Sequence, residues 1–142
     1  MSVEFAVVMA PLLLLSFGFI ATTAAMYTKS AMQNNAQMAA RMMATGQIKN
    51  FASGPIVGAN ATATTACNPS LANTMVEHYA CRDLPNWANY TVTSTQTCGV
   101  PSVTVTIVAS AFTSAKMGDV NGILSGKTLT TKSVLMKEGT CT

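Results

Sequence analysis

The sequence predicts an α+β protein in which a long, kinked N-terminal hydrophobic helix carries a small, disulfide-stapled head built on an antiparallel β-sheet. Three observations lead to this prediction. Residues 5–28 contain no charged side chain, strand-like alternation appears only in the C-terminal half, and all four cysteines lie beyond the hydrophobic segment. We therefore expect two parts, an N-terminal helix over residues 1–53 and a globular β-rich head over residues 54–142.

The uncharged segment at residues 5–28 is long enough to cross a membrane. Its 24 residues exceed the roughly 20 that a helix needs to span the hydrocarbon core of a bilayer. Pro11 and Gly18 weaken a helix, but membrane helices tolerate such residues where neighbouring helices satisfy the freed carbonyl groups. We expect a membrane-spanning helix with a kink or a short unwound stretch near Pro11.

A cleaved secretory signal is the alternative interpretation of this segment, because Thr23, Ala24 and Ala25 resemble a small-residue cleavage site. A signal peptide begins with a basic region, however, whereas this chain has no Lys or Arg before Lys29. Positive charge normally marks the cytoplasmic side of a membrane helix. We therefore expect that the helix is retained and that a short basic leader is removed before Met1.

The helical pattern continues past the hydrophobic segment. Residues 27–51 contain no proline and are rich in Ala, Met and Gln, which form helices readily. Four apolar residues recur at steps of four, three and four, which places them on one helix face: Met32, Ala36, Ala39 and Met43. We expect a helix of about 45 residues, roughly 70 Å long, that ends no later than Gly54 and Pro55.

The head begins with a segment of weak periodicity. Residues 52–88 are rich in Gly, Pro, Asn, Ala and Thr, which predicts loops and one short helix near residues 71–79. Trp87 and Tyr90 could form an exposed adhesive patch, but a single Trp beside the first strand is more often part of a core.

Three strands are predicted after this segment, at residues 90–97, 100–112 and 127–136. The alternation in the second strand predicts one buried face, formed by Val103, Val105, Ile107, Ala109 and Ala111. Turn residues at Gly99 and Pro101, and again within residues 118–122, separate the strands. We expect an antiparallel meander of three or four strands.

The four cysteines predict two disulfides, since an even number in an exported region favours pairing. Cys67, His78 and Cys81 could instead supply three metal ligands, but their spacing matches no paired zinc motif. In a meander the first and third strands finish at the same end of the sheet, where the second strand begins. Cys98 follows the first strand and Cys141 the third, so we predict Cys98 with Cys141 and, by elimination, Cys67 with Cys81.

The composition argues against nucleic-acid binding and gives little support to catalysis. Charged residues make up 9% of the chain, and the net charge of +3 comes from scattered Lys and Arg residues. Reactive groups crowd together only at residues 77–83, where a thiol beside His78 could act as a nucleophile. A disulfide-bonded Cys81 beside a solvated polar turn is the interpretation we favour. We expect no catalytic residue, no metal and no cofactor.

The opening of the chain resembles a known family. Residues 3–15, Val-Glu-Phe-Ala-Val-Val-Met-Ala-Pro followed by four leucines, are similar to the opening of TadE-like pilins of the tight-adherence (Tad or Flp) branch of type IV pilus systems. The alanine-rich helix ending near Arg41 and the strands at residues 103–106 and 129–136 are also similar. The resemblance implies a precursor that a prepilin peptidase cuts. Inner-membrane pilus assembly machinery then moves the subunit from the lipid bilayer into a helical homopolymer of identical subunits.

Glu4 is expected to set the register between subunits. A carboxylate at the edge of an apolar span is costly unless a cation pairs with it, and Lys29 lies about 37 Å away along a helix. We expect Glu4 to pair with an α-amino group of the same or a neighbouring subunit; a solvated glutamate at headgroup level is the alternative. The other expected assembly residues lie in the hydrophobic helix: Phe5, Pro11, Leu12, Leu13, Leu14, Leu15, Phe17 and Phe19.

These observations predict a structural pilus subunit, and not an enzyme, that forms an extracellular filament for adhesion or surface attachment. Three alternatives remain at this point. The chain could be a minor pilin-like subunit of the assembly machine, a membrane-anchored envelope ectodomain that does not polymerise, or a membrane-anchored enzyme that uses residues 77–83.

Overall fold

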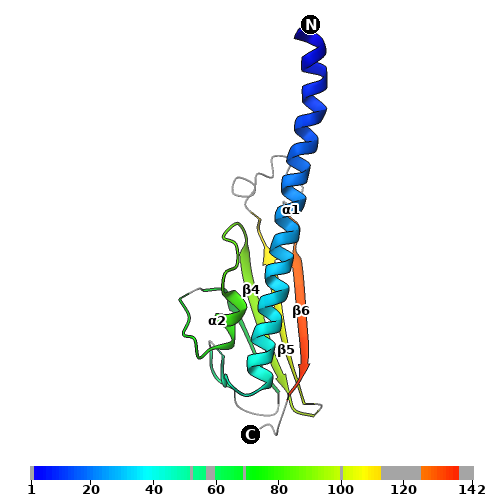
Figure 1. The fold of residues 1–142 in the computed structure, drawn as a ribbon. Helices are drawn as coiled ribbons and strands as arrows, with labels where there is room; N and C mark the ends of the chain where they lie inside the picture. Colours follow the sequence, from blue (N-terminus) through cyan, green and yellow to red (C-terminus); the bar gives the residue numbers. More distant parts are fainter. Residues whose placement is uncertain are drawn as a thin grey trace.

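The protein combines one long helix with a four-stranded antiparallel sheet (Figure 1). This arrangement confirms the predicted α+β class. The computed structural model describes residues 2–51, 53–56, 60–68, 70–99, 101–112 and 126–137.

Helix α1 extends over Ser2–Ala44 and has two different halves. Its C-terminal half lies along one face of the sheet, whereas its N-terminal half protrudes beyond the sheet (Figure 1). The helix is continuous through Pro11, so the unwound stretch considered for this position is absent, and the kink remains a prediction. The predicted contact face is confirmed by four side chains that are at most 1% exposed: Met32, Ala36, Ala39 and Met43.

The helix ends at Ala44, which lies before the latest end expected from Gly54 and Pro55. Gly46 adopts a left-handed conformation with φ +68°. The Gln47 N–H donates to the Met42 carbonyl at 3.1 Å, and the Gly46 N–H donates to the Met43 carbonyl at 3.2 Å. These two bonds form a Schellman motif, which satisfies the last carbonyls of the helix and reverses the chain. Glycine adopts this conformation at little cost because it has no Cβ.

The main sheet is an antiparallel meander in the order β3-β4-β5-β6. Its strands are β3 (Asn60–Ala66), β4 (Asn89–Thr97), β5 (Ser102–Ser110) and β6 (Leu129–Met136). The last three match the strands predicted from the sequence. Strand β3 lies in the segment predicted to be loops, so that prediction is wrong for these residues. The strand was missed because Ala and Thr alternate there without a large apolar side chain that would mark a buried face.

Three smaller elements complete the described fold. Strands β1 (Asn50–Phe51) and β2 (Gly54–Pro55), of two residues each, form an antiparallel pair. Helix α2 (Val76–Cys81) packs against α1. The short helix therefore begins and ends later than the predicted residues 71–79. Phe51 is only 3% exposed and belongs to the core cluster that joins α1, α2 and the sheet. The division of the chain at residue 53 remains a prediction.

The core lies between α1 and the inner face of the sheet. Val103, Val105, Ile107 and Ala109 of β5 are all fully buried, as the alternation predicts. Ala111 was expected on the same face but is exposed. It adopts φ +48° just after the end of β5, which breaks the alternation.

The turn predictions are confirmed only in part. Gly99 and Pro101 lie in the turn between β4 and β5. The turn expected within residues 118–122 lies outside the described residues.

The Cys67–Cys81 disulfide is present, with a Cα–Cα distance of 5.4 Å. It joins the end of β3 to the end of α2 across 14 residues, and a loop of this size gives about 3 kcal/mol of stabilisation in the chain-entropy model. Because both thiols are bonded, the alternative metal site with His78 is contradicted. Cys98 is also disulfide-bonded, but its predicted partner Cys141 lies outside the described residues.

Candidate assembly surface

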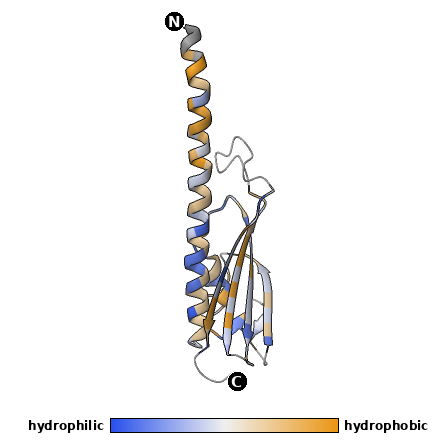
Figure 2. Ribbon diagram, turned by 90° about the vertical axis from the view of Figure 1, so that its right-hand side faces the viewer, coloured by the Kyte–Doolittle hydropathy of each residue, from blue (hydrophilic) through white to orange (hydrophobic). Residues whose placement is uncertain are grey.

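The protruding half of α1, which we call the apolar half and define as residues 5–27, exposes large apolar side chains. Figure 2 shows that this half is mostly hydrophobic, whereas hydrophilic residues gather on the half beside the sheet. The following side chains are 39–73% exposed: Phe5, Val7, Val8, Met9, Leu12, Leu13, Leu14, Leu15, Phe19, Ile20, Met26 and Tyr27. Monomeric soluble proteins rarely expose a continuous patch of this kind, so a lipid or protein partner is expected to cover it.

The serine and threonine side chains of the apolar half bond to its own backbone. Three hydroxyls each donate to the carbonyl four residues earlier: Ser16 to Leu12 at 2.9 Å, Thr22 to Gly18 at 3.0 Å and Thr23 to Phe19 at 2.8 Å. These bonds satisfy the hydroxyls internally, which makes them compatible with an apolar environment. Among the described residues, α1 is the one helix long and apolar enough to cross a membrane.

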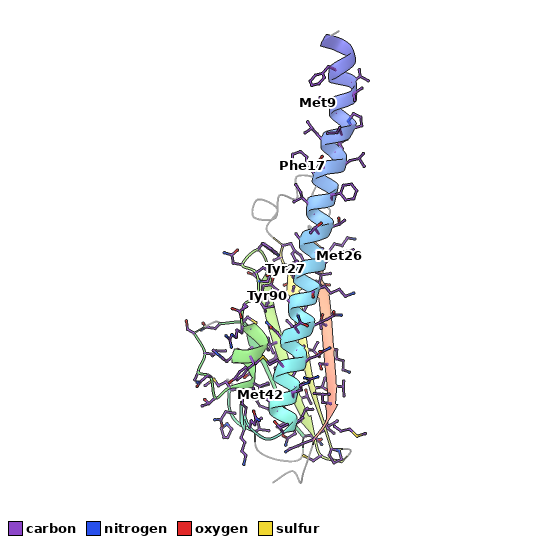
Figure 3. All side chains as sticks on the ribbon, in the orientation of Figure 1. Met9, Phe17, Met26, Tyr27, Met42 and Tyr90 are labelled. Atoms are coloured by element: carbon purple, nitrogen blue, oxygen red, sulfur yellow. A yellow bond between two sulfur atoms is a disulfide. The ribbon has the colours of Figure 1, made fainter. Side chains whose placement is uncertain are left out.

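Most of the expected assembly residues are exposed in the single chain. Phe5 and Phe19 are 65% and 71% exposed, and Pro11 lies on the same open surface as the four leucines. Phe17 differs, because it is partly buried (Figure 3). Glu4 lies within α1, but its side chain is not among those that the structure describes.

A hydrogen bond fixes the head to α1 where the apolar half ends. The Trp87 Nε1–H donates to the Thr28 hydroxyl at 2.9 Å, and the Thr28 hydroxyl donates to the Ala24 carbonyl at 2.8 Å. Thr28 is fully buried, and the rings of Tyr27 and Trp87 lie 6.2 Å apart. The half-buried Trp87 therefore packs on the helix, which supports a structural role over an adhesive patch. The sequence indicates Thr28 only as the last residue of the uncharged segment.

A second contact holds α1 against the end of α2. The Asn35 side-chain amide donates to the Arg82 carbonyl and, at 3.5 Å, to the Ala80 carbonyl. The sequence does not predict this contact, because Asn35 lies on a helix and its partners are backbone groups 45 and 47 residues later.

Tyr90 lies at the start of β4, with its hydroxyl close to that of Thr28 on α1 (Figure 3). It is only 8% exposed, and this burial raises the pKa of its hydroxyl to about 12. The Thr28 hydroxyl offsets part of the increase. The Tyr90 hydroxyl makes no hydrogen bond of normal geometry with a described residue, so burial dominates.

The thiol nucleophile considered at residues 77–83 is contradicted by the disulfide at Cys81. Cys81 is in a disulfide, and His78 places Nδ1 2.8 Å from the Leu71 carbonyl. The expected solvated turn is correct for Arg82 and Asp83, which form an exposed ion pair at 3.2 Å. It is wrong for Glu77, which is fully buried. The described residues contain no group of three His, Cys, Asp or Glu side chains that could hold a metal.

The comparison with known families concerns α1. Residues 1–41 match the family model described as TadE-like protein. The match covers the apolar half and most of the buried half of α1, but none of the head. No curated protein and no solved structure gives a match. The TadE-like resemblance expected from residues 3–15 is confirmed over residues 1–41.

Proposed function

We propose that this chain is a structural pilus subunit that polymerises through the apolar half of α1 into an extracellular filament. The observation that carries the proposal is the exposure of this half-helix, within a segment that matches a pilus-associated family. Burying one large aliphatic or aromatic side chain is worth about 1.5–3 kcal/mol. A dozen such side chains exposed to water would therefore be too costly, so the apolar half needs lipid before assembly and neighbouring helices afterwards.

Transfer from lipid to neighbouring helices brings no hydrophobic gain by itself, because lipid chains are as apolar as leucine. Assembly must therefore draw on close packing and on polar groups that find partners between subunits. Glu4 is the proposed polar group at the N-terminal end. The Val7 carbonyl is a second polar group that could find a partner between subunits. Pro11 lacks an N–H and therefore leaves this carbonyl without its usual donor in the helix.

The two halves of α1 are proposed to have different roles in the filament. The apolar half would form the filament core, and the head, which packs on the buried half through Met32 and Met43, would face outward. In this arrangement the head is the part available for adhesion or surface attachment. A prepilin peptidase and inner-membrane assembly machinery are the proposed processing partners.

Purified extracellular filaments test the proposal. We expect mass spectrometry to identify this chain as a main component, and antibodies against the head to label the filaments along their length. Label confined to a few positions would make the chain a minor pilin-like subunit. Recovery of the chain from the membrane fraction alone would contradict polymerisation.

A further inference from the structure

The end of the head nearest the apolar half of α1 carries aromatic and cationic side chains. We call this end the rim and define it by four residues, Tyr27, Lys29, Trp87 and Lys127. The first two lie on α1, and the other two lie just before β4 and β6. Tyr27 is 58% exposed, and both lysines are exposed.

The strand register places Trp87 and Lys127 at the same end of the sheet. Ala109 of β5 pairs with Tyr90 of β4 on one side and with Leu129 of β6 on the other. Trp87 precedes Tyr90 and Lys127 precedes Leu129, so both lie beyond this end of the strands. Figure 1 shows that α1 leaves the sheet at the same end.

The length of the apolar segment puts the rim at the surface of a bilayer. Residues 5–28 measure about 36 Å along a helix, and the hydrocarbon core is about 30 Å thick. When the N-terminal end lies at one membrane surface, the other surface therefore falls near Tyr27 and Lys29. The Trp87–Thr28 hydrogen bond of 2.9 Å holds the head at this level.

The side chains of the rim fit the chemistry of phospholipid headgroups. Tyr and Trp concentrate at the boundary between headgroups and acyl chains, because one end of each ring system is apolar and the other is polar. Lys29 and Lys127 form no ion pair with a described residue. Their ammonium groups can therefore bind phosphate without breaking an ion pair with another described residue.

We propose that the rim binds the headgroups of anionic phospholipids, with Lys29 and Lys127 on phosphate and with Tyr27 and Trp87 at the headgroup level. The proposal rests on the proposed membrane insertion of α1 before assembly. This contact holds the head against the bilayer until the subunit is extracted.

Trp87 is the only tryptophan in the chain, so its fluorescence reports on the rim directly. The full-length protein is inserted into phosphatidylcholine vesicles that contain either spin-labelled phosphatidylglycerol or spin-labelled phosphatidylcholine at equal fraction, with the label near the headgroup. We expect both lipids to quench Trp87 and the anionic one to quench more strongly. Each lysine is expected to enrich the anionic lipid nearby up to about fivefold.

Matched double variants separate this contact from general charge attraction. Lys29→Gln with Lys127→Gln should remove the difference between the two labelled lipids. Lys49→Gln with Lys132→Gln removes the same charge from exposed positions away from the rim, and should leave the difference unchanged.

Two results would overturn the proposal. One is equal quenching by both lipids in the unmodified protein, and the other is no quenching although α1 is inserted. Insertion is read independently, from flotation with the vesicles and resistance to alkaline extraction. A protein that fails to insert would contradict the proposed function, and the rim proposal with it.

Discussion

Two polar residues, Thr28 and Glu4, flank the apolar half of α1. Thr28 lies inside the fold and bonds to Trp87 and Ala24. Glu4 lies at the other end, about 37 Å from Lys29, the nearest basic side chain in the sequence. Thr28 therefore has its partners within the chain, whereas Glu4 is proposed to pair with an α-amino group of the same or a neighbouring subunit.

The first prediction concerns Glu4. Glu4→Ala should leave the protein expressed and inserted in the membrane, because a shorter apolar side chain lowers the cost of insertion. It should strongly reduce assembly, because the proposed ionic contact between subunits is lost. The measurement is the amount of subunit in sheared filaments relative to the membrane fraction.

Glu4→Gln is the matched control for this prediction, since it keeps the shape of the side chain and removes its charge. We expect Glu4→Gln to assemble as poorly as Glu4→Ala. A normal filament yield from either variant would rule out the ionic register role.

The second prediction is a loss of stability at alkaline pH that comes from Tyr90. Its pKa is about 12 in the fold against about 10 in an unfolded chain. The unfolded state therefore loses its proton first as the pH rises, which lowers the free energy of unfolding between about pH 10 and pH 12. The contribution is fully present below pH 10.

Denaturant midpoints measured across this range for the unmodified protein and for Tyr90→Phe check the second prediction. The phenylalanine variant should lose less stability as the pH rises, since it has no proton to release. Parallel loss in the two proteins would show that Tyr90 is not the responsible group.

At the scale of elements, the sequence predicts a structure well where one face is strongly apolar. The alternation of Val103, Val105 and Ile107 predicts β5 and its buried face, and the spacing of Met32 and Met43 predicts the buried face of α1. Strand β3 escapes prediction because its buried position is occupied by Ala63, which differs little in hydropathy from its neighbours.

The apolar half of α1 is easier to recognise in the sequence than the Thr28–Trp87 contact, for a physical reason. The apolar half is a continuous run of uncharged residues and needs no knowledge of the fold. The Thr28–Trp87 contact joins residues 59 positions apart, and no local pattern indicates such a pair. The burial of Glu77 likewise depends on how α2 packs against α1.

The third prediction concerns the end of α1. Gly46→Ala should lower the free energy of unfolding by about 1–2 kcal/mol, because a left-handed conformation is unfavourable for a residue with a Cβ. The expected fall in Tm is about 2–8 °C for each kcal/mol. Thermal unfolding in detergent measures it.

Gly99→Ala is the matched control, since Gly99 has no left-handed φ and an added Cβ meets nothing within 4 Å at either glycine. The control should change Tm little. Equal effects at the two positions would mean that the Schellman motif does not determine where the helix stops.

At the scale of the whole molecule, disulfides constrain the head. The Cys67–Cys81 bond ties β3 to α2. The predicted Cys98–Cys141 bond would tie the chain beyond β6 to the turn after β4, and its loop of over 40 residues gives about 4 kcal/mol in the chain-entropy model. Non-reducing peptide mapping checks this fourth prediction, and a peptide that links Cys67 to Cys98 would contradict it.

The fifth prediction tests whether the apolar half of α1 is the assembly interface. Leu13 is 47% exposed in the single chain, and Leu13→Asp puts a charge where either lipid or neighbouring helices should lie. Such a charge costs about 2.5–3.5 kcal/mol at the centre of a membrane helix. Thr104→Asp on the outer face of the sheet adds the same charge away from this interface.

The decisive measurement is the ratio of filament-incorporated to membrane-inserted subunit for the unmodified protein, Leu13→Asp and Thr104→Asp, determined by quantitative immunoblotting of both fractions. Normalising to the inserted protein separates failure of assembly from failure of insertion. We expect the ratio to fall at least about tenfold for Leu13→Asp and to change little for Thr104→Asp. A Leu13→Asp ratio equal to that of the unmodified protein would contradict assembly through the apolar half of α1.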